Sequence, residues 1–235
     1  MLTQESMAAW ASWRQATCFP DDCFCEAIHQ GLIRQPANTW SSLGFVVVAV
    51  AVALSFFGDR DRSKGGLSRA ETSLFIGSLL VVGLGSAFYH ASLTFIGQVI
   101  DVSGMYLVAT FVLLHRLGPR FNLPPGAAVL SFAAINGLLM VAQVTTPSMR
   151  RVAFGILLIS AIVVEWRASP ARRRWFAIGA GLMALAFAIW ILDRWRIVCA
   201  PQSLVQGHAL WHVLGATAAA ALFNHYEGDR TTPGG

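Results

Sequence analysis

Charged residues are scarce in this sequence. Asp, Glu, Lys and Arg make up only 12% of the 235 residues, whereas soluble domains carry about 25%. Hydrophobic residues make up 55%. A soluble protein of this length needs many more charged side chains to cover its surface, so the composition excludes an ordinary soluble domain. It indicates an integral membrane protein.

Lysine is almost absent, and the sequence contains no long basic tract. Lys64 is the single lysine among the 17 basic residues, and the net charge is +5. The basic residues stand in short clusters between apolar blocks. This is the positive-inside pattern of membrane proteins, which places anionic lipid headgroups beside the basic loops. We therefore expect the membrane as a partner, and no nucleic acid.

No cleavable signal peptide is evident. The first 37 residues contain no continuous apolar stretch of the kind that forms the centre of a signal peptide, and their charged residues include Arg14, Asp21, Asp22, Glu26 and Arg34. The chain also lacks an internal repeat, so an inverted-repeat transporter has no support. We expect an N-terminal extracytoplasmic segment (1–37), a membrane domain (38–226) and a short C-terminal tail (227–235).

Seven apolar stretches are candidates for membrane-spanning helices. A crossing needs about 20 mostly apolar residues, because a helix rises about 1.5 Å per residue and the hydrocarbon is about 30 Å thick. Clusters of charged and turn-forming residues separate the stretches. The predicted fold is an all-α, seven-transmembrane helix bundle with spans at 38–57, 72–91, 97–115, 126–144, 152–167, 175–193 and 203–225.

The distribution of Lys and Arg predicts the orientation. If the N-terminus is extracytoplasmic, the cytoplasmic segments carry eleven Lys and Arg and the opposite segments carry six. The excess marks the cytoplasmic side, so we expect the N-terminus outside and the C-terminus in the cytoplasm. The four cysteines then all lie on the oxidising side, which favours at least one disulfide. Three pairings are possible among Cys18, Cys23, Cys25 and Cys199.

Polar residues interrupt the apolar stretches at three places. The second stretch ends with Ser86 and His90, the third begins near Asp101, and the seventh begins with His208 and His212. Because successive spans run in opposite directions, all three places reach the same membrane face, whichever way the protein is inserted. Ionisable side chains within a bilayer are costly and mark functional sites. We expect an active site toward the extracytoplasmic leaflet.

The histidine spacing predicts a metal site. His208 and His212 are four residues apart, so they lie one turn apart on one helix face. With His90 they form a set of three ligands that leaves the fourth tetrahedral position open, as in catalytic zinc sites. Asp101 can accept a proton from the water that zinc acidifies, and Ser86 can face that water or a substrate oxygen. Three histidines also suit other transition metals.

Each of these residues also has a simpler interpretation. A single histidine in a membrane helix is more often an interhelical hydrogen-bonding residue than a ligand, and a serine near a helix end commonly bonds back to the helix. The occurrence of His90, Asp101, His208 and His212 at one depth favours the metal.

The remaining polar residues do not point to a site by themselves. Asp193, at the end of the sixth stretch, fits a contact that orients a ligand histidine, and it fits a helix cap or a pair with Arg194 about as well. We expect His115 and His225 at the opposite interface, and Glu165 near a helix end with its carboxylate reaching the headgroups.

The combined pattern resembles the alkaline ceramidase family, within a superfamily of seven-helix membrane hydrolases that includes the adiponectin-type and progestin-type receptors. The motifs that carry the resemblance are Ser86-x3-His90-x10-Asp101, His208-x3-His212, Cys25-Glu26, Asn38-Thr39-x-Ser41, Trp190-x2-Asp193 and Cys199. They extend over nearly the whole membrane domain.

The resemblance implies a reaction and a role for each residue. Zinc would be held by His90, His208 and His212, Asp101 would accept the proton, and Ser86 would stabilise the oxyanion. Ceramide and water would give a sphingoid base and a fatty acid. The resemblance also implies a disulfide between Cys25 and Cys199.

One departure from the family concerns calcium. Animal alkaline ceramidases carry a calcium site in the N-terminal segment, built around Asp-Trp-Cys-Glu-x-Asn and a later Glu. Here the corresponding residues are Cys23 to Ile28, with Gln35 at the later position, so Glu26 alone remains of those carboxylates. Calcium prefers several hard oxygen ligands, so we predict that calcium regulation is lost, unless Asp21 or Asp22 substitutes.

Three other functions remain open at this point. The protein could hydrolyse another N-acyl lipid or an ester lipid, or it could be a receptor-like signalling protein with a zinc site, although its cytoplasmic segments are short. A transporter or channel would need polar residues through the full depth of the membrane, and here they gather at one face.

Overall fold

The structure is a computed structural model of the chain, and it describes residues 9–20, 23–58, 66–168 and 173–228. Within these ranges the regular elements are all helices, and the one isolated bridge joins Gln15 and Thr94. The all-α prediction is confirmed. The helices are α1 (Pro36–Ser42), α2 (Gly44–Gly58), α3 (Arg69–Ser92), α4 (Phe95–Arg120), α5 (Pro125–Thr145), the short 3-10 helix η2 (Pro147–Met149), α6 (Arg150–Ala168), α7 (Arg173–Arg194) and α8 (Gly207–Gly228).

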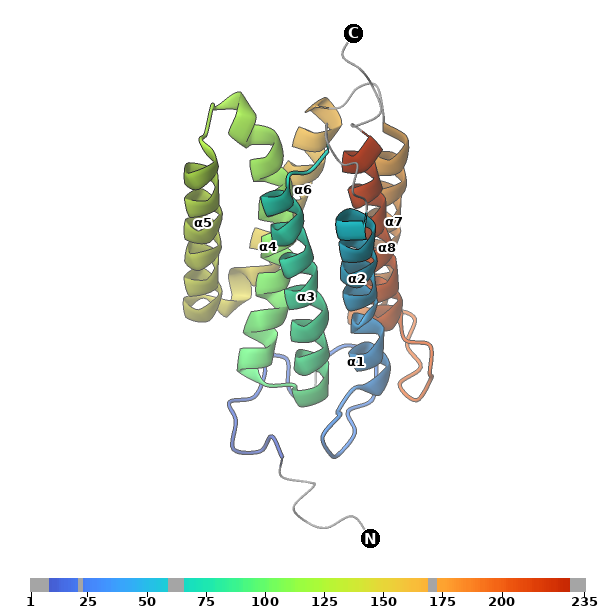
Figure 1. Ribbon diagram of the computed structural model, residues 1–235. Helices are drawn as coiled ribbons and strands as arrows, with labels where there is room; N and C mark the ends of the chain where they lie inside the picture. Colours follow the sequence, from blue (N-terminus) through green and yellow to red (C-terminus); the bar gives the residue numbers. More distant parts are fainter. Residues whose placement is uncertain (1–8, 21–22, 59–65, 169–172, 229–235) are drawn as a thin grey trace.

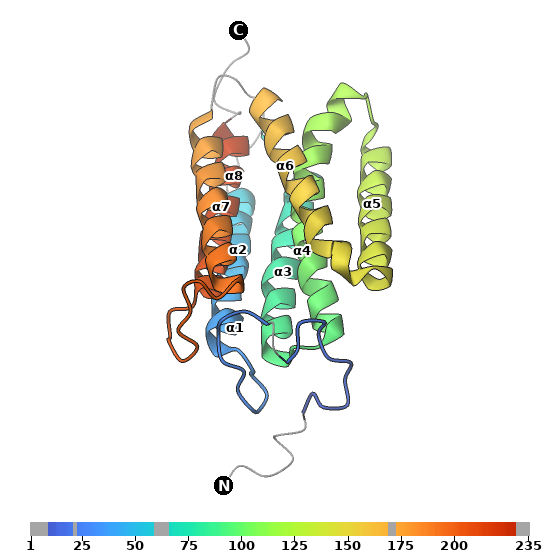
Figure 2. The ribbon, with the colours of Figure 1, turned by 180° about the vertical axis from the view of Figure 1, so that it is seen from behind.

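The long helices lie alongside one another in a bundle (Figures 1 and 2). The N-terminal segment and α1 lie at one end, which we call the N-terminal end of the bundle, and α8 finishes at the other end. The last turn of α3 and the first turn of α8 both lie at the N-terminal end. The polar patches that the sequence predicts at one depth therefore share one end of the bundle.

A tight reversal joins α3 to α4. Only two residues link them: Leu93 adopts a left-handed conformation (φ 48°), and the Thr94 side chain caps α4 by accepting a hydrogen bond from the Gly97 N–H. The two helices approach closely, because a Cβ atom on Gly104 would lie 2.7 Å from the Val82 Cα. This close antiparallel packing brings the end of α3 next to the start of α4.

Among the described residues, six helical stretches have the length and apolar composition to cross a membrane: α1 with α2, then α3, α4, α5, η2 with α6, and α7. The first predicted span is broken between Ser42 and Gly44, where α1 ends and α2 begins. The last helix begins at Gly207, not at residue 203, because the chain forms turns over Pro201–Gln206. α8 is 22 residues long but falls outside the six, since histidines and other polar residues occupy both of its ends.

The N-terminal segment is tied to this end of the bundle. Two disulfides are present, Cys18–Cys23 and Cys25–Cys199. The second joins the segment to the loop before α8, and the Ala27 N–H donates to the Pro201 carbonyl in the same place (2.9 Å). The segment therefore covers the ends of α3, α4 and α8.

Candidate metal centre and cavity

Three imidazoles meet at the N-terminal end of the bundle. His90 lies in the last turn of α3, and His208 and His212 lie in the first two turns of α8. One ring nitrogen from each lies within 4.8 Å of the others, and the Nε2 atoms of His90 and His208 are 3.1 Å apart. The three side chains are at most 4% exposed. They form the group of histidines and acids within the described residues that can hold a metal ion.

Side chains from α1 and the residue before it fix the outer nitrogens of two of these rings. The Nδ1 of His90 lies 2.8 Å from the Oε1 of Gln35. The Nδ1 of His212 lies 2.9 Å from the Ser41 hydroxyl and 3.3 Å from that of Ser42. Because the Gln35 oxygen only accepts, the His90 Nδ1 carries the proton. The Nε2 of His90 is then unprotonated, and its lone pair faces the centre, where it can bind a metal.

His208 is held by stacking. Its ring lies 3.6 Å from the Phe24 ring, nearly parallel to it. Its Nδ1 has no hydrogen-bond partner among the described residues. Phe24, which has a positive φ of 65°, lies between the two disulfide-bonded cysteines Cys23 and Cys25. The disulfides therefore hold this aromatic cover in place over the histidines.

Ser86 and Asp101 lie beside the histidines. The Ser86 hydroxyl, one turn before His90, is 3.2 Å from the Nε2 of His212. Asp101 lies within hydrogen-bonding reach of Ser86, as the α3–α4 reversal requires. Both residues border the same cavity as His208 and His212. The structure thus gathers all five residues that the sequence selects for the site.

The donor set fits a metal ion such as zinc. Positive charge on three buried imidazoles this close together would be unfavourable, whereas neutral imidazole nitrogens are preferred zinc ligands. Gln35, Ser41 and Ser42 supply the outer contacts that ligand histidines usually have. Of these three, only Ser41 belongs to a motif that the sequence singles out. Gln35 and Ser42 are fully buried, and no local sequence pattern marks their contacts with the histidines.

Asp193 contacts the backbone and not an imidazole. Its two carboxylate oxygens accept from the N–H groups of His208 and Cys25, each at 3.1 Å. Negative charge at a helix N-terminus is favourable, so Asp193 caps α8 and attaches the N-terminal segment to it. The helix cap that the sequence allowed is therefore present in the structure. Asp193 positions His208 through the helix backbone.

Glu26 caps a helix in the same way. Its carboxylate accepts from the N–H groups of Ala37 (2.6 Å) and Asn38 (2.9 Å) at the start of α1. Burial raises the pKa of this carboxyl, while the two N–H donors lower it. Nearby, the Gln35 amide nitrogen donates to the carbonyls of Cys23 (2.5 Å) and Glu26 (3.2 Å). The alternative calcium ligands, Asp21 and Asp22, lie outside the described residues.

An apolar cavity of about 430 Å³ extends from this site into the bundle. Ser86, Asp101, His208 and His212 border it at the N-terminal end. Mostly hydrophobic side chains of α4, α6, α7 and α8 line the remainder, with a few from α2 and α3. A pocket of this size with a few polar groups at one end suits a long apolar ligand with one polar group.

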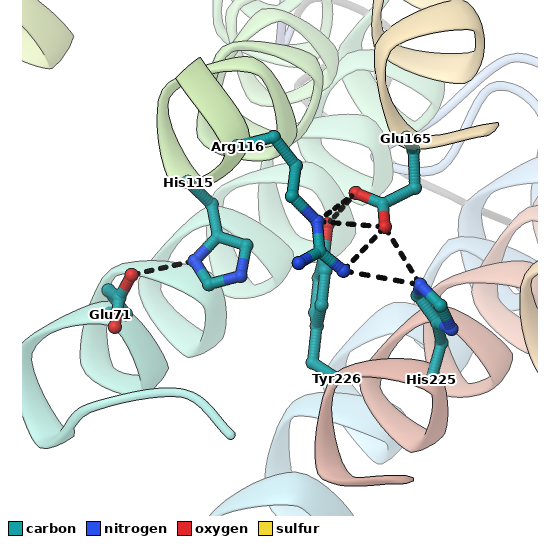
Figure 3. Close-up of polar contacts among 6 residues, drawn as sticks. All are labelled: Glu71, His115, Arg116, Glu165, His225 and Tyr226. Carbon is teal, nitrogen blue, oxygen red and sulfur yellow. Dashed lines mark hydrogen bonds and ion pairs between the residues drawn. The ribbon is translucent and has the colours of Figure 1, made fainter. Parts of the chain in front are cut away.

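A second polar cluster lies at the opposite end of the bundle (Figure 3). The Glu165 carboxylate of α6 forms an ion pair with Arg116 of α4 (2.6 Å) and bonds with His225 (2.7 Å) and Tyr226 (3.2 Å) of α8. His115 pairs separately with Glu71 (2.7 Å). Glu165 and His225 lie near the ends of α6 and α8, as expected, but both side chains are 0% exposed, so the expectation that they face the headgroups is wrong. Partners from two other helices make their burial favourable.

Comparisons with known proteins agree with this geometry. The family model described as Ceramidase matches residues 23–231. An alkaline ceramidase of Caenorhabditis elegans is 24% identical over 207 residues, which cover 80% of this chain and 71% of that protein. The matched region contains every residue of the metal centre.

Proposed function

The chain belongs to the ceramidase family, and on this premise we propose that it is a zinc-dependent membrane amidohydrolase. Its substrate would be a ceramide-like lipid, cleaved at the N-acyl amide to a sphingoid base and a fatty acid. The observation that carries the proposal is the position of three buried imidazoles, a carboxylate and a hydroxyl at one end of a long apolar cavity.

His90, His208 and His212 would hold the metal, with their unprotonated nitrogens directed to the centre. When bound, zinc supplies polarisation of a carbonyl and acidification of a water. The short contacts of Gln35 and Ser41 keep the rings of His90 and His212 oriented for this task.

The chain's own residues perform the remaining steps. Asp101 accepts a proton from the attacking water and delivers it to the amide nitrogen as the carbon–nitrogen bond breaks. The Ser86 hydroxyl donates to the carbonyl oxygen as negative charge develops on it. The water oxygen ends in the fatty acid, and the nitrogen leaves as the amine of the sphingoid base. The cavity lined by α4, α6, α7 and α8 holds the acyl chain.

The function is tested by hydrolysis of defined lipids by the purified protein. The panel contains an N-acyl sphingoid lipid, a simpler N-acyl amide and a phospholipid ester. We expect cleavage of the N-acyl sphingoid lipid and its loss in His212→Ala. His29→Ala, at an exposed histidine away from the site, is the matched control and should keep the wild-type rate. Preference for the ester, or wild-type rates in His212→Ala, would contradict the proposal.

We further propose that α8 is the seventh crossing and that the N-terminal end of the bundle is extracytoplasmic. The 22 residues of α8 extend about 33 Å, and His208, His212 and His225 are buried in the bundle, away from lipid. Both disulfides at this end fit the oxidising side. A reporter that matures only in the cytoplasm should be active when fused at the C-terminus and inactive when inserted between Pro201 and Gln206. The reverse result would invert the topology.

A further inference from the structure

The cavity follows one stripe on each of α6 and α7. On α7 the stripe runs from Phe176 to Trp190, with lining residues three or four positions apart. On α6 it runs from Arg150 to Ile162. Fourteen residues of helix rise about 21 Å, whereas one leaflet of a bilayer about 30 Å thick is about 15 Å deep. The stripe is therefore long enough to accompany one complete acyl chain away from the metal centre.

The polar cluster of Figure 3 begins one helical turn beyond the end of this cavity. Three helices show the same register: a residue that lines the cavity is followed four positions later by a member of the cluster. The pairs are Val112 and Arg116 on α4, Ala161 and Glu165 on α6, and Leu222 and Tyr226 on α8. Four residues make about one turn on one helix face, so the cluster lies behind the last lining residues.

The cluster is a barrier that an apolar chain cannot displace easily. Glu165 is fully buried, and its carboxylate is bonded to a guanidinium, an imidazole and a phenol at once. Separating a buried ion pair leaves an uncompensated charge in an apolar region, which is strongly unfavourable. A methyl terminus that reached this depth would have to separate these groups, so the network fixes the depth of the cavity.

Phe176 forms the remaining part of the cavity's far end, the end opposite the histidines. It lines the cavity near the start of α7, is 6% exposed, and its ring lies 5.7 Å from the His225 ring. Asp193, which caps α8 beside the histidines, is seventeen residues further along the same helix. Phe176 is therefore the large side chain that an extended chain from the metal centre meets last.

We propose that Phe176 and Ala161, backed by the Arg116–Glu165–His225–Tyr226 cluster, form an end wall that sets the longest acyl chain the enzyme accepts. This inference rests on the proposed function and specifies its substrate class further. Insertion of additional methylenes against a packed wall costs roughly 5- to 150-fold in binding. The rate should accordingly fall by about tenfold or more once the chain exceeds the length that the wall allows.

Two substitutions move the wall in opposite directions. Phe176→Ala removes the ring and should shift the fall in kcat/KM to acyl chains longer by a few methylenes. Ala161→Phe adds a ring at the same depth and should shift it to shorter chains, and Ala161→Leu is the milder variant should the ring prevent folding. Val163→Phe is the matched control, because Val163 lies on the same helix, is 41% exposed and does not line the cavity. It should leave the length profile unchanged.

The experiment measures kcat/KM for N-acyl sphingoid lipids of graded chain length, and the thermal stabilisation of each variant by free fatty acids of the same lengths. The second readout needs no hydrolysis, so it reports on the wall even if no lipid of the panel is cleaved. Opposite shifts in Phe176→Ala and in Ala161→Phe or Ala161→Leu support the inference. Length profiles that stay the same as in wild type in both readouts would overturn it, while the proposed function would stand on wild-type hydrolysis alone.

Discussion

The Nε2 atoms of His90 and His208 lie 3.1 Å apart, although 118 residues separate the two histidines in the chain. Two helices bring them together, and neither ring has room to turn away, because Gln35 holds one and Phe24 stacks on the other. Two neutral imidazoles at this distance direct lone pairs to a common point. With His212, the pair forms a group of histidines that can hold a metal ion.

Asp101→Asn should reduce hydrolysis strongly and leave the metal in place. The substitution keeps the shape of the side chain and removes the proton acceptor, and general acid–base groups contribute about 10²- to 10⁴-fold. The measurement is kcat together with the metal content of the same preparation. A wild-type rate in Asp101→Asn would remove this residue from the mechanism.

Ser86→Ala should lower kcat by about 10²- to 10³-fold, the effect of losing one donor to an oxyanion. Ser78→Ala is the matched control, since Ser78 is two turns earlier on α3, is equally buried and bonds back to the Leu74 carbonyl. Steady-state kinetics of the two variants separates the roles. Equal rates in both would show that the Ser86 hydroxyl only packs.

Glu165→Gln should destabilise the protein by about 3–5 kcal/mol, because it leaves the Arg116 guanidinium without its buried carboxylate. Glu71→Gln is the comparison. Glu71 pairs with His115 and forms a capping box with Ser68, but it is partly exposed and glutamine keeps the capping contact, so the substitution should cost about 1 kcal/mol or less. Thermal unfolding in detergent measures both. A smaller effect at Glu165 than at Glu71 would mean that the cluster contributes little to the packing of α4, α6 and α8.

Wild-type activity should not depend on calcium. The Gln35 amide nitrogen donates to the carbonyls of Cys23 and Glu26, so N–H groups occupy a place where a cation would need oxygen ligands. Gln35→Glu should introduce calcium dependence, since its carboxylate would face those two carbonyl oxygens and need a cation between them. Activity across a calcium series, buffered by a chelator selective for calcium, tests both proteins. Calcium-dependent wild-type activity would contradict the prediction.

The metal centre could be predicted from sequence because its signals are local or follow from helix direction. The spacing of His208 and His212 gives one helix face, and the alternation of helix directions brings His90 to the same end. The polar cluster around Glu165 could not be predicted in this way. Its members come from three helices with no common spacing, so each one taken alone has the pattern of an interfacial residue.

The ends of the helices were also only partly predictable. The first span reads as one apolar helix, but the chain forms α1 and α2 with Leu43 between them. The contacts of Gln35 and Ser42 with the histidines depend on the position of α1 against α3 and α8, which no local pattern encodes. Asp193 fitted several roles from sequence, and its contacts with the backbone N–H groups of His208 and Cys25 show that it caps α8.

The metal content of the purified protein tests the central claim most directly. Elemental analysis of protein purified without added metal should find about one zinc per chain in wild type, the same amount in His29→Ala, and little or none in His208→Ala when that variant is still folded. A folded wild-type protein without a transition metal, or a His208→Ala variant that keeps the full amount, would contradict the account.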